Sequence, residues 1–417
     1  MKIAFIMGFF PSLSTTFIHN QLTGLIDAGH EIHVFAFCHP VGQKTHPEIE
    51  QYRLLDKVSY FSIPQNRIQR VLKAVFLLVR HFSQGPKLIL KTLNWPKYGK
   101  NALNLNLFYY ALPFLGKKFD IIHAHSGPNG MVGCWLRELG FKSKLVTTFY
   151  GADLSSFVRE NGVEFYQPLF ASADLLLPIC QYFKEKLQNW GCAEEKILVH
   201  PVGVDLEIFK PCLLPTEPSK RFKILTVARL IEKKGIEFGL RAVAEASRRH
   251  DQIDYTIAGY GPDATRLRAL AIELGIAQRV TFTGAIDQDE ELRLLQQHDL
   301  FLLPSITAAS GEEEGTPTVL LEAQAAGLPV ISTRHSGIPE IVLDGATGFL
   351  VGEKNVPALV DRIVYLIENT TCAAQMGREG RAYMERDFDI RKLNRRLEKF
   401  YQDLLLGKRP LSEMNLS

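Results

Sequence analysis

Two carboxylates, Glu314 and Glu322, are the residues of this chain best placed to do chemistry. The stretch between them predicts a helix that is capped by Thr316, begins at Pro317 and ends at Gly327. The start of a helix offers unpaired N–H groups and the positive end of its dipole. This pattern therefore predicts a site for an anion such as phosphate, with one carboxylate before the helix and one within it.

Glu322 is the only charged residue between Gly315 and Thr333. A lone carboxylate in so apolar a stretch needs a polar partner, because burying it unpaired is costly. Hydroxyl groups of a ligand would serve, and the alternatives are a core arginine or contact with water. Glu314 lies just before the helix, on a loop able to enter a cleft.

A second group of charges follows a predicted strand at 222–227 and precedes a predicted helix at 235–249. Arg229 and Lys234 lie on this loop, where ligands of open α/β sheets collect. A guanidinium and an ammonium suit a diphosphate, although a solvated basic loop has the same composition. Gly259, after the next strand, allows close approach of the backbone, as in many strand-to-helix turns.

Two histidines, His123 and His125, follow an apolar run in the first half of the chain. We expect them to point to opposite faces of a strand, His123 into the core and His125 towards a cleft. Too few further ligands lie nearby for a metal site. The loops 8–16 and 147–153, with Tyr150 and Asp153 in the second, either line the cleft or only connect elements.

The pair Asp287 and Asp289 has the D-x-D spacing that holds a metal in some enzymes. It also opens an amphipathic run at 290–297. Aspartate at the start of a helix is well explained by capping and by the helix dipole. We therefore predict that this pair caps a helix and that the protein has no metal site.

The elements that must position these residues come in two similar sets. Helices alternate with apolar strands, which predicts parallel sheets covered on both faces. We expect an α/β fold of two Rossmann-like domains facing across a cleft, at 1–200 and 221–388. A proline-rich linker at 201–220 joins them, and a charged helix in 389–417 packs back across the junction. The strands are predicted at 2–7, 31–37, 121–124, 145–148, 175–179, 222–227, 255–258, 280–282, 300–303 and 330–332, with further helices at 16–28 and 264–274.

Composition agrees with this size and class. The chain has 417 residues, of which 46% are hydrophobic and 22% charged, as in a globular protein of two domains. No apolar stretch approaches the roughly 20 residues needed to cross a bilayer. The first apolar run is too short for a signal peptide and is better explained as a strand. The six cysteines are scattered, which favours free thiols in a reducing cytosol.

The charge is unevenly distributed. Segment 57–119 has eleven Lys or Arg residues and no Asp or Glu, and it also contains apolar runs. A helix carrying both could rest on the inner face of an anionic membrane. A solvated helical insertion is the alternative, and nucleic acid fits less well because no known binding motif accompanies the charge.

Together the motifs resemble those of a known enzyme family. H-x-H, T-x-x-x-G-x-D, R-x4-K-G, G-x-G-P and E-G-x-P-x4-E, in this order, are similar to those of the retaining GT-B glycosyltransferases of family GT4. The phrases Thr-Phe-Tyr-Gly-Ala-Asp-Leu at 148–154 and Phe-Pro-x-Leu-Ser at 10–14 look most like exopolysaccharide enzymes of the colanic-acid type.

The resemblance implies roles for individual residues. The donor diphosphate would be bound by Arg229 and Lys234, and the ribose hydroxyls by Glu322. Catalytic contacts to the transferred sugar would come from Glu314 and His125. The rest of the donor site would comprise Gly8, Gly259, Thr316, Pro317, Thr318 and Val319, with Tyr150 and Asp153 on the acceptor side. Two departures leave the acceptor side open: many members have His at the position of Tyr150, and the first loop lacks their Gly-Gly pair.

The function that this resemblance implies is transfer of a hexose from a UDP- or GDP-sugar to a glycan or lipid-linked acceptor. Retention of the anomeric configuration and activity without a metal or other cofactor are expected. The alternatives are a nucleotide-sugar epimerase, a phosphorylase, or a non-catalytic binding subunit of a polysaccharide assembly complex. Product formed without acceptor would indicate the first, dependence on inorganic phosphate the second, and absence of donor turnover the third.

Overall fold

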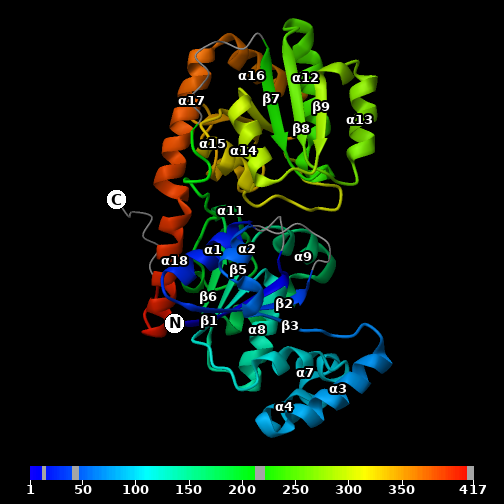
Figure 1. The fold of residues 1–417 in the computed structure, drawn as a ribbon, viewed down its shortest axis with the longest axis vertical. Coiled ribbons are helices and arrows are strands. Elements are labelled where there is room, and N and C mark those ends of the chain that lie inside the picture. The colour runs from blue at the N-terminus through cyan, green and yellow to red at the C-terminus, as the bar shows by residue number, and fades with distance from the viewer. Residues whose placement is uncertain (12–15, 40–46, 212–220, 411–417) are drawn as a thin grey trace.

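The computed structural model describes residues 1–11, 16–39, 47–211 and 221–410. Two six-stranded parallel sheets stand one above the other in Figure 1, each with helices on both faces. This confirms the predicted α/β class with two Rossmann-like domains. The domain limits 1–200 and 221–388 stay predictions, although the first sheet ends at Pro178 and the second begins at Phe222.

The first sheet has the strand order β3-β2-β1-β4-β5-β6. Its central strands are almost wholly buried because apolar clusters cover both faces, which is why they read as continuous apolar runs. The short edge strand β3 carries no apolar run and was not predicted. The strands are β1 (Lys2–Phe9), β2 (Glu31–Cys38), β3 (Val58–Tyr60), β4 (Ile121–His125), β5 (Lys144–Phe149) and β6 (Leu175–Pro178).

The second sheet repeats this topology in the order β12-β11-β10-β7-β8-β9. In both sheets successive strands are added outwards on one side of the first strand and then on its other side. The strand order therefore switches direction at the middle, between β1 and β4 and between β7 and β10. Ligands of open α/β sheets bind outside the carboxyl ends of the strands at such a switch point. The strands are β7 (Phe222–Val227), β8 (Ile253–Ala258), β9 (Val280–Gly284), β10 (Leu300–Leu303), β11 (Val330–Thr333) and β12 (Gly348–Val351), the last of which was not predicted.

Helices cover the sheets and connect the strands. The predicted helices at 16–28, 235–249 and 264–274 are present within one residue at each end. The helices are α1 (Thr16–Asp27), α2 (Pro47–Gln51), α3 (Arg67–His81), α4 (Pro86–Thr92), α5 (Trp95–Tyr98), α6 (Lys100–Leu103), α7 (Asn106–Ala111), α8 (Gly127–Leu139), α9 (Ser156–Asn161), α10 (Gln167–Ser172), α11 (Gln181–Asn189), α12 (Ile236–Arg249), α13 (Ala264–Glu273), α14 (Gln288–Gln297), α15 (Thr318–Ala325), α16 (Val356–Glu368), α17 (Thr370–Tyr383) and α18 (Ile390–Leu405).

The last helix joins the two domains, as predicted. In Figure 1, α17 lies along the upper domain and α18 continues down the side of the lower one. Between them Val204 exchanges backbone hydrogen bonds with Phe388 and Ile390. The apolar side of α18, including Leu397 and Tyr401, is buried in the core of the first domain. This packing ties the chain end to the N-terminal sheet.

The segment between β3 and β4 forms a helical lobe, made of α3 to α7, on the N-terminal domain. In Figure 1 it projects from the end of the molecule opposite to the second domain. None of the helices in the described part of the chain is both long and apolar enough to cross a membrane.

Candidate active site

The central feature of the site is a largely buried ion pair on the C-terminal domain. The Lys234 Nζ atom lies 2.8 Å from Glu314 Oε1; the side chain of Glu314 is buried, and that of Lys234 is 12% exposed. Lys234 belongs to the loop after β7 and Glu314 to the loop after β10, so the pair spans the switch point of this sheet. Removing one partner of such a pair leaves the other charge buried, at a cost of about 3–5 kcal/mol.

Both members of the pair have shifted pKa values. Burial acts to raise the pKa of Glu314, but attraction by Lys234 and Lys233 outweighs it and the net shift is downward. Burial lowers the pKa of Lys234, an effect that Glu314 opposes and that Arg229 slightly increases. The carboxylate is therefore ionised at neutral pH and neutralises the cation beside it.

Sequence reasoning missed the groups that hold the Glu314 loop in place. The backbone N–H of Glu314 donates to His335 Nε2 at 3.0 Å, and His335 Nδ1 lies 2.7 Å from Glu353. Lys233, also buried, lies 2.8 Å from Glu312. No motif contains His335 or Glu353, because β11 and the following turn separate them from Glu314 in the chain. Lys233 was adjacent to a predicted residue, but its burial was not evident from the sequence.

The helix after Glu314 begins later than predicted. α15 starts at Thr318, Pro317 occupies the N-cap position, and Thr316 makes no capping hydrogen bond, so the predicted cap is wrong. Proline at this position has an extended conformation, which shortens the helix by one residue. The N–H groups of Thr318 and Val319 are in the first turn, where no intrahelical acceptor exists. The predicted end near Gly327 is confirmed, since Gly327 has a φ of 83°.

Glu322 is buried, as its apolar surroundings predicted, but its partner is an acid. Its side chain shares a hydrogen bond with Glu291 of α14. Burial raises the pKa of Glu322 well above its usual value, and the neighbouring Glu291 raises it further. Burial likewise raises the pKa of Glu291 to about 7. The raised pKa values indicate that the pair holds a proton, and the partner of Glu322 is an acid instead of the core arginine considered as an alternative.

Arg229 and Gly259 lie at the carboxyl ends of neighbouring strands. A Cβ atom on Gly259 would lie 1.8 Å from the carbonyl oxygen of Ala228, and its φ is 140°. Only glycine fits here, so the two loops touch through their backbones. Arg229 is exposed and near enough to Lys234 to lower its pKa. This places an available guanidinium beside the buried ammonium.

On the N-terminal domain the two predicted histidines lie together. Their rings stack with centroids 4.4 Å apart, so the expectation of opposite faces is wrong: residues two apart on a strand share a face. His123 is buried and bonded to Thr148 and Tyr401, as expected of a core residue. His125 Nδ1 lies 2.6 Å from the Tyr150 hydroxyl, and burial lowers the pKa of His125, so the ring is neutral.

The loop after β5 brings the two domains into contact. A Cβ on Gly315 would lie 2.1 Å from the Tyr150 carbonyl oxygen, so Gly315 permits this approach. Lys186 Nζ also lies 2.6 Å from Glu313 across the junction. The loop that contains Glu314 is thus clamped between the domains, next to Tyr150.

The carboxylate of Asp153 is buried within its own domain. Its carboxylate accepts hydrogen bonds from the backbone N–H groups of Gly127, Tyr150 and Gly151, at 3.0, 3.1 and 2.8 Å. These contacts position the loop, in which Tyr150 and Gly151 lie against the backbone around Gly315 of the other domain. Gly8 lies inside β1 instead of in the loop after it, because the strand continues to Phe9. Part of the predicted loop, residues 12–15, lies outside the described residues.

Comparison with known proteins agrees with this arrangement. The model of the family described as glycosyl transferases group 1 matches residues 215–383, and that of the glycosyl transferase 4-like domain matches 14–203. A putative colanic acid biosynthesis glycosyltransferase, WcaL of Escherichia coli, is 35% identical over 97% of this chain and all of its own length. The amylovoran biosynthesis glycosyltransferase AmsK of Erwinia amylovora is 34% identical over the same shares.

This chain belongs to the group 1, GT4-like glycosyltransferases. The solved structure of Anabaena HepE in complex with UDP and glucose is similar to it in fold. That likeness covers 97% of this chain and all of the other, with a TM-score of 0.73 and 19% sequence identity. The GT-B architecture predicted from the motifs is thereby confirmed.

The D-x-D pair of this glycosyltransferase serves a helix start. Asp287 is the N-cap of α14, and its side chain accepts a hydrogen bond from the Glu290 N–H at 3.1 Å. Within the described ranges, no cluster of three or more potential ligands could hold a metal. The predicted capping role of Asp287 is confirmed.

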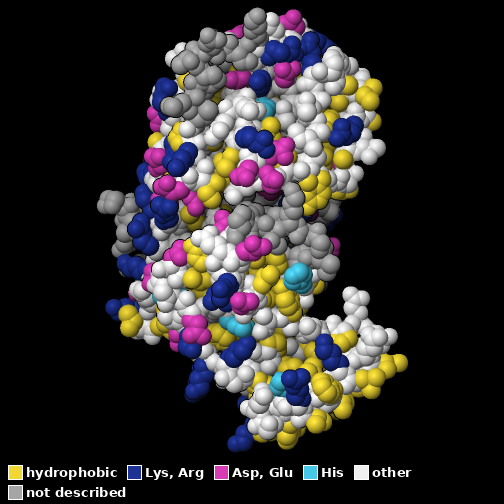
Figure 2. Space-filling view, viewed as in Figure 1, with side chains coloured by type: hydrophobic (Ala, Val, Ile, Leu, Met, Phe, Trp, Pro, Cys, Tyr) yellow, Lys and Arg dark blue, Asp and Glu magenta, His cyan; other side chains and the backbone are white. Residues whose placement is uncertain are grey.

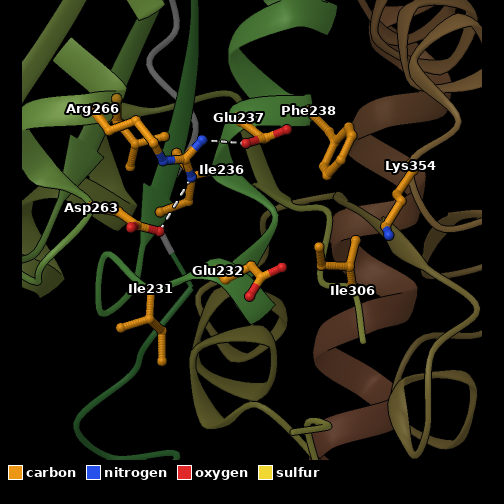
Figure 3. Close-up of a pocket in the computed structure, with 10 residues that line it drawn as sticks. Ile231, Glu232, Ile236, Glu237, Phe238, Asp263, Arg266, Ile306 and Lys354 are labelled. Atoms are coloured by element: carbon orange, nitrogen blue, oxygen red, sulfur yellow. Dashed lines mark hydrogen bonds and ion pairs between the residues drawn. The ribbon is translucent and has the colours of Figure 1, made fainter. Parts of the chain in front are cut away.

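A separate hollow of about 150 Å³ lies beside the Lys234 loop (Figure 3). In this hollow Arg266 is paired with Glu237 and Asp263, and Glu232 and Lys354 point into the same space. Neither Lys234, Glu314 nor Glu322 lines it.

Proposed function

We propose that this glycosyltransferase moves a hexose from a UDP- or GDP-sugar to a glycan or lipid-linked acceptor in exopolysaccharide biosynthesis. The observation that carries the proposal is the Lys234–Glu314 ion pair beside exposed Arg229 and the first turn of α15. The biosynthetic context is proposed from the two full-length relatives, which are named for colanic acid and amylovoran synthesis.

The difficult step is separation of charge as the diphosphate leaves the anomeric carbon. Lys234, Arg229 and the N–H groups of Thr318 and Val319 are positioned to stabilise that leaving charge. Fixed donors of this kind contribute most where water is excluded, because they need no reorientation during the reaction. In this proposal these groups do the work that a metal ion does elsewhere.

In this proposal Glu314 holds the transferred sugar. Its loop is held by the hydrogen bond to His335 and by the close contact of Gly315 with the Tyr150 backbone. Glu322, together with Glu291, is placed to receive the ribose hydroxyls. His125 is neutral and has a buried Nε2 atom without a partner among the described residues, so it can bond a sugar hydroxyl. We propose attack on the same face as departure, with the leaving phosphate oxygen taking the acceptor proton, so that configuration is retained.

The test has two stages. Thermal unfolding in the presence of a panel of UDP- and GDP-sugars identifies the donor, because a bound ligand stabilises the folded state. The reaction is then followed by NMR with that donor and a polysaccharide-repeat acceptor, with and without EDTA. We expect a product with the donor's anomeric configuration, formed equally well in EDTA. An inverted product would refute retention, strict metal dependence would refute the charge-stabilisation account, and a lack of turnover would indicate a binding subunit.

A further inference from the structure

The helical lobe between β3 and β4 has its own small core. Ala74 of α3, Ile89 of α4, and Phe108 and Tyr109 of α7 form one buried apolar cluster. The Tyr109 hydroxyl also donates to the Arg70 carbonyl oxygen at 2.6 Å. One side of α3 is therefore fixed against the lobe, which determines what its other side presents.

The other side of α3 is apolar and turned to solvent. Its residues recur at intervals of three and four, so they form one stripe along the helix. Large apolar side chains gathered on an exposed surface mark a site of interaction. The stripe consists of Ile68, Val71, Leu72, Val75, Phe76 and Val79, which are between 52% and 74% exposed.

Exposed basic residues lie on the same helix as the stripe and on the neighbouring helices of the lobe. Arg67 and Arg80, near the two ends of α3, are exposed, and so are Lys87, Lys97 and Lys100 of the neighbouring helices. The whole segment 57–119 contains no Asp or Glu against its eleven basic residues. Figure 2 shows hydrophobic and basic side chains side by side on the lobe at the lower right. The surface of the lobe therefore combines the apolar stripe with these exposed basic residues, called its basic border below, and carries no acidic residue.

We propose that the α3 stripe and its basic border dock this protein on a bilayer that contains anionic lipids. A helix with one apolar face and a basic polar face lies in the plane of the interface, with the apolar side chains among the lipid chains. The anionic headgroups attract the surrounding cations. A second copy of the chain fits less well, because a symmetric contact would set each basic border against an identical one.

Docking through the lobe leaves the second domain free. The lobe lies at the far end of the molecule from β7 to β12, as Figure 1 shows. The N-terminal domain would be held at the membrane while the donor domain stays in solvent. This arrangement suits the lipid-linked kind of acceptor in the proposed function, but the docking itself requires neither donor nor turnover.

Flotation of the purified full-length chain with lipid vesicles tests the proposal. We expect it to float at low salt with vesicles of phosphatidylcholine mixed with phosphatidylglycerol, and not with phosphatidylcholine alone. High salt should release it, because the Debye length falls to about 3 Å at 1 M. Failure of the wild-type chain to float with the mixed vesicles at low salt would overturn the proposal, whatever its transfer activity.

Two sets of substitutions locate the contact. The triple variant Val75→Ser, Phe76→Ser, Val79→Ser should lower binding at least about tenfold, because three large apolar side chains would no longer be inserted among the lipid chains. Each of Arg67→Gln and Arg80→Gln should lower it about fivefold. The matched control is Ile272→Ser. Ile272 lies on α13 of the second domain and is 69% exposed, so this variant should bind vesicles as the wild type does.

Thermal unfolding checks that each variant is folded, and the arginine variants decide the test if the triple variant is not. Equal flotation of the wild type and the folded variants would refute docking through α3. Light scattering provides the remaining outcome: if the stripe variant loses self-association while flotation is unchanged, the stripe is a contact between copies and the proposal is wrong.

Discussion

The two domains share one strand order, yet their facing edges carry different chemistry. On the C-terminal edge the charged groups Lys234 and Glu314 are 2.8 Å apart and have little contact with solvent. On the N-terminal edge His125 and Tyr150 are joined at 2.6 Å, and both are neutral because burial disfavours their charged forms. One edge is ionic and internally compensated, whereas the other is neutral and aromatic.

This difference shows that the shared topology determines where ligands collect but not which ligands they are. Charge that grows on a leaving diphosphate calls for fixed cations and backbone donors, as on the C-terminal edge. Sugar hydroxyls are better matched by neutral donors and acceptors, as on the N-terminal edge. The comparison predicts that changes on the two edges will alter different steps of the reaction.

The largest effect should come from Lys234→Ala. It removes the cation proposed to stabilise the leaving diphosphate, so kcat should fall about 10²–10³-fold and nucleotide diphosphate binding should weaken. Steady-state kinetics and calorimetric titration with the diphosphate measure the two effects. Lys223→Ala, at the other end of β7, is the control and should behave as the wild type. Full activity of Lys234→Ala would refute the proposal that the C-terminal edge stabilises the leaving diphosphate through Lys234.

Glu314→Gln should separate sugar transfer from nucleotide binding. The neutral amide no longer neutralises Lys234, so the diphosphate should bind at least as tightly as in the wild type. Transfer should still fall about a hundredfold, because the contact to the sugar in the transition state is lost. Glu312→Gln, which alters a carboxylate paired with Lys233, is the comparison variant. Weaker diphosphate binding together with normal transfer would contradict this assignment.

His125→Ala tests the neutral edge, and its expected effect is smaller. One hydrogen bond to the sugar is lost, so kcat should fall about tenfold, equivalent to roughly 1.4 kcal/mol. Affinity for the free diphosphate should not change, since His125 belongs to the other domain. His123→Gln, which changes a core residue bonded to Tyr401, should instead lower the unfolding temperature. A loss of diphosphate affinity in His125→Ala would break the proposed division of roles.

The smallest effect concerns the Glu291–Glu322 pair and is seen in stability. The folded state raises the pKa of Glu291 from 4.5 to about 7. Folded protein therefore retains a proton that the unfolded chain loses above pH 4.5, so this group makes the free energy of unfolding fall as pH rises towards 7. Glu291→Gln should flatten that decline and stabilise the protein at pH 7 by an amount on the order of 1 kcal/mol.

Urea unfolding across this pH range measures the effect, with Glu290→Gln as the control. An unchanged pH slope in Glu291→Gln would mean that the pair does not share a proton in the folded protein. Loss of the pH slope in Glu290→Gln would mean that Glu290, and not Glu291, causes the pH dependence of stability.

Much of this protein could be predicted from its sequence. The continuous apolar runs defined the central strands, because strands buried on both faces must be apolar throughout. The E-G-x-P-x4-E and R-x4-K-G motifs located Glu314, Arg229 and Lys234 on loops, and Glu322 within a helix, at the carboxyl edge of the second sheet. The edge strands β3 and β12 were missed because their short segments carry too weak a pattern.

The tertiary structure alone decided the partners of these residues. Glu322 faces Glu291, His335 connects Glu314 to Glu353, and His123 reaches Tyr401 in the last helix. Local sequence patterns report periodicity and turn chemistry within a few residues, whereas these contacts join elements far apart in the chain. The charge block at 57–119 was equally visible in the sequence, but only the packing of Ala74 against the lobe determined that the apolar stripe of α3 faces solvent.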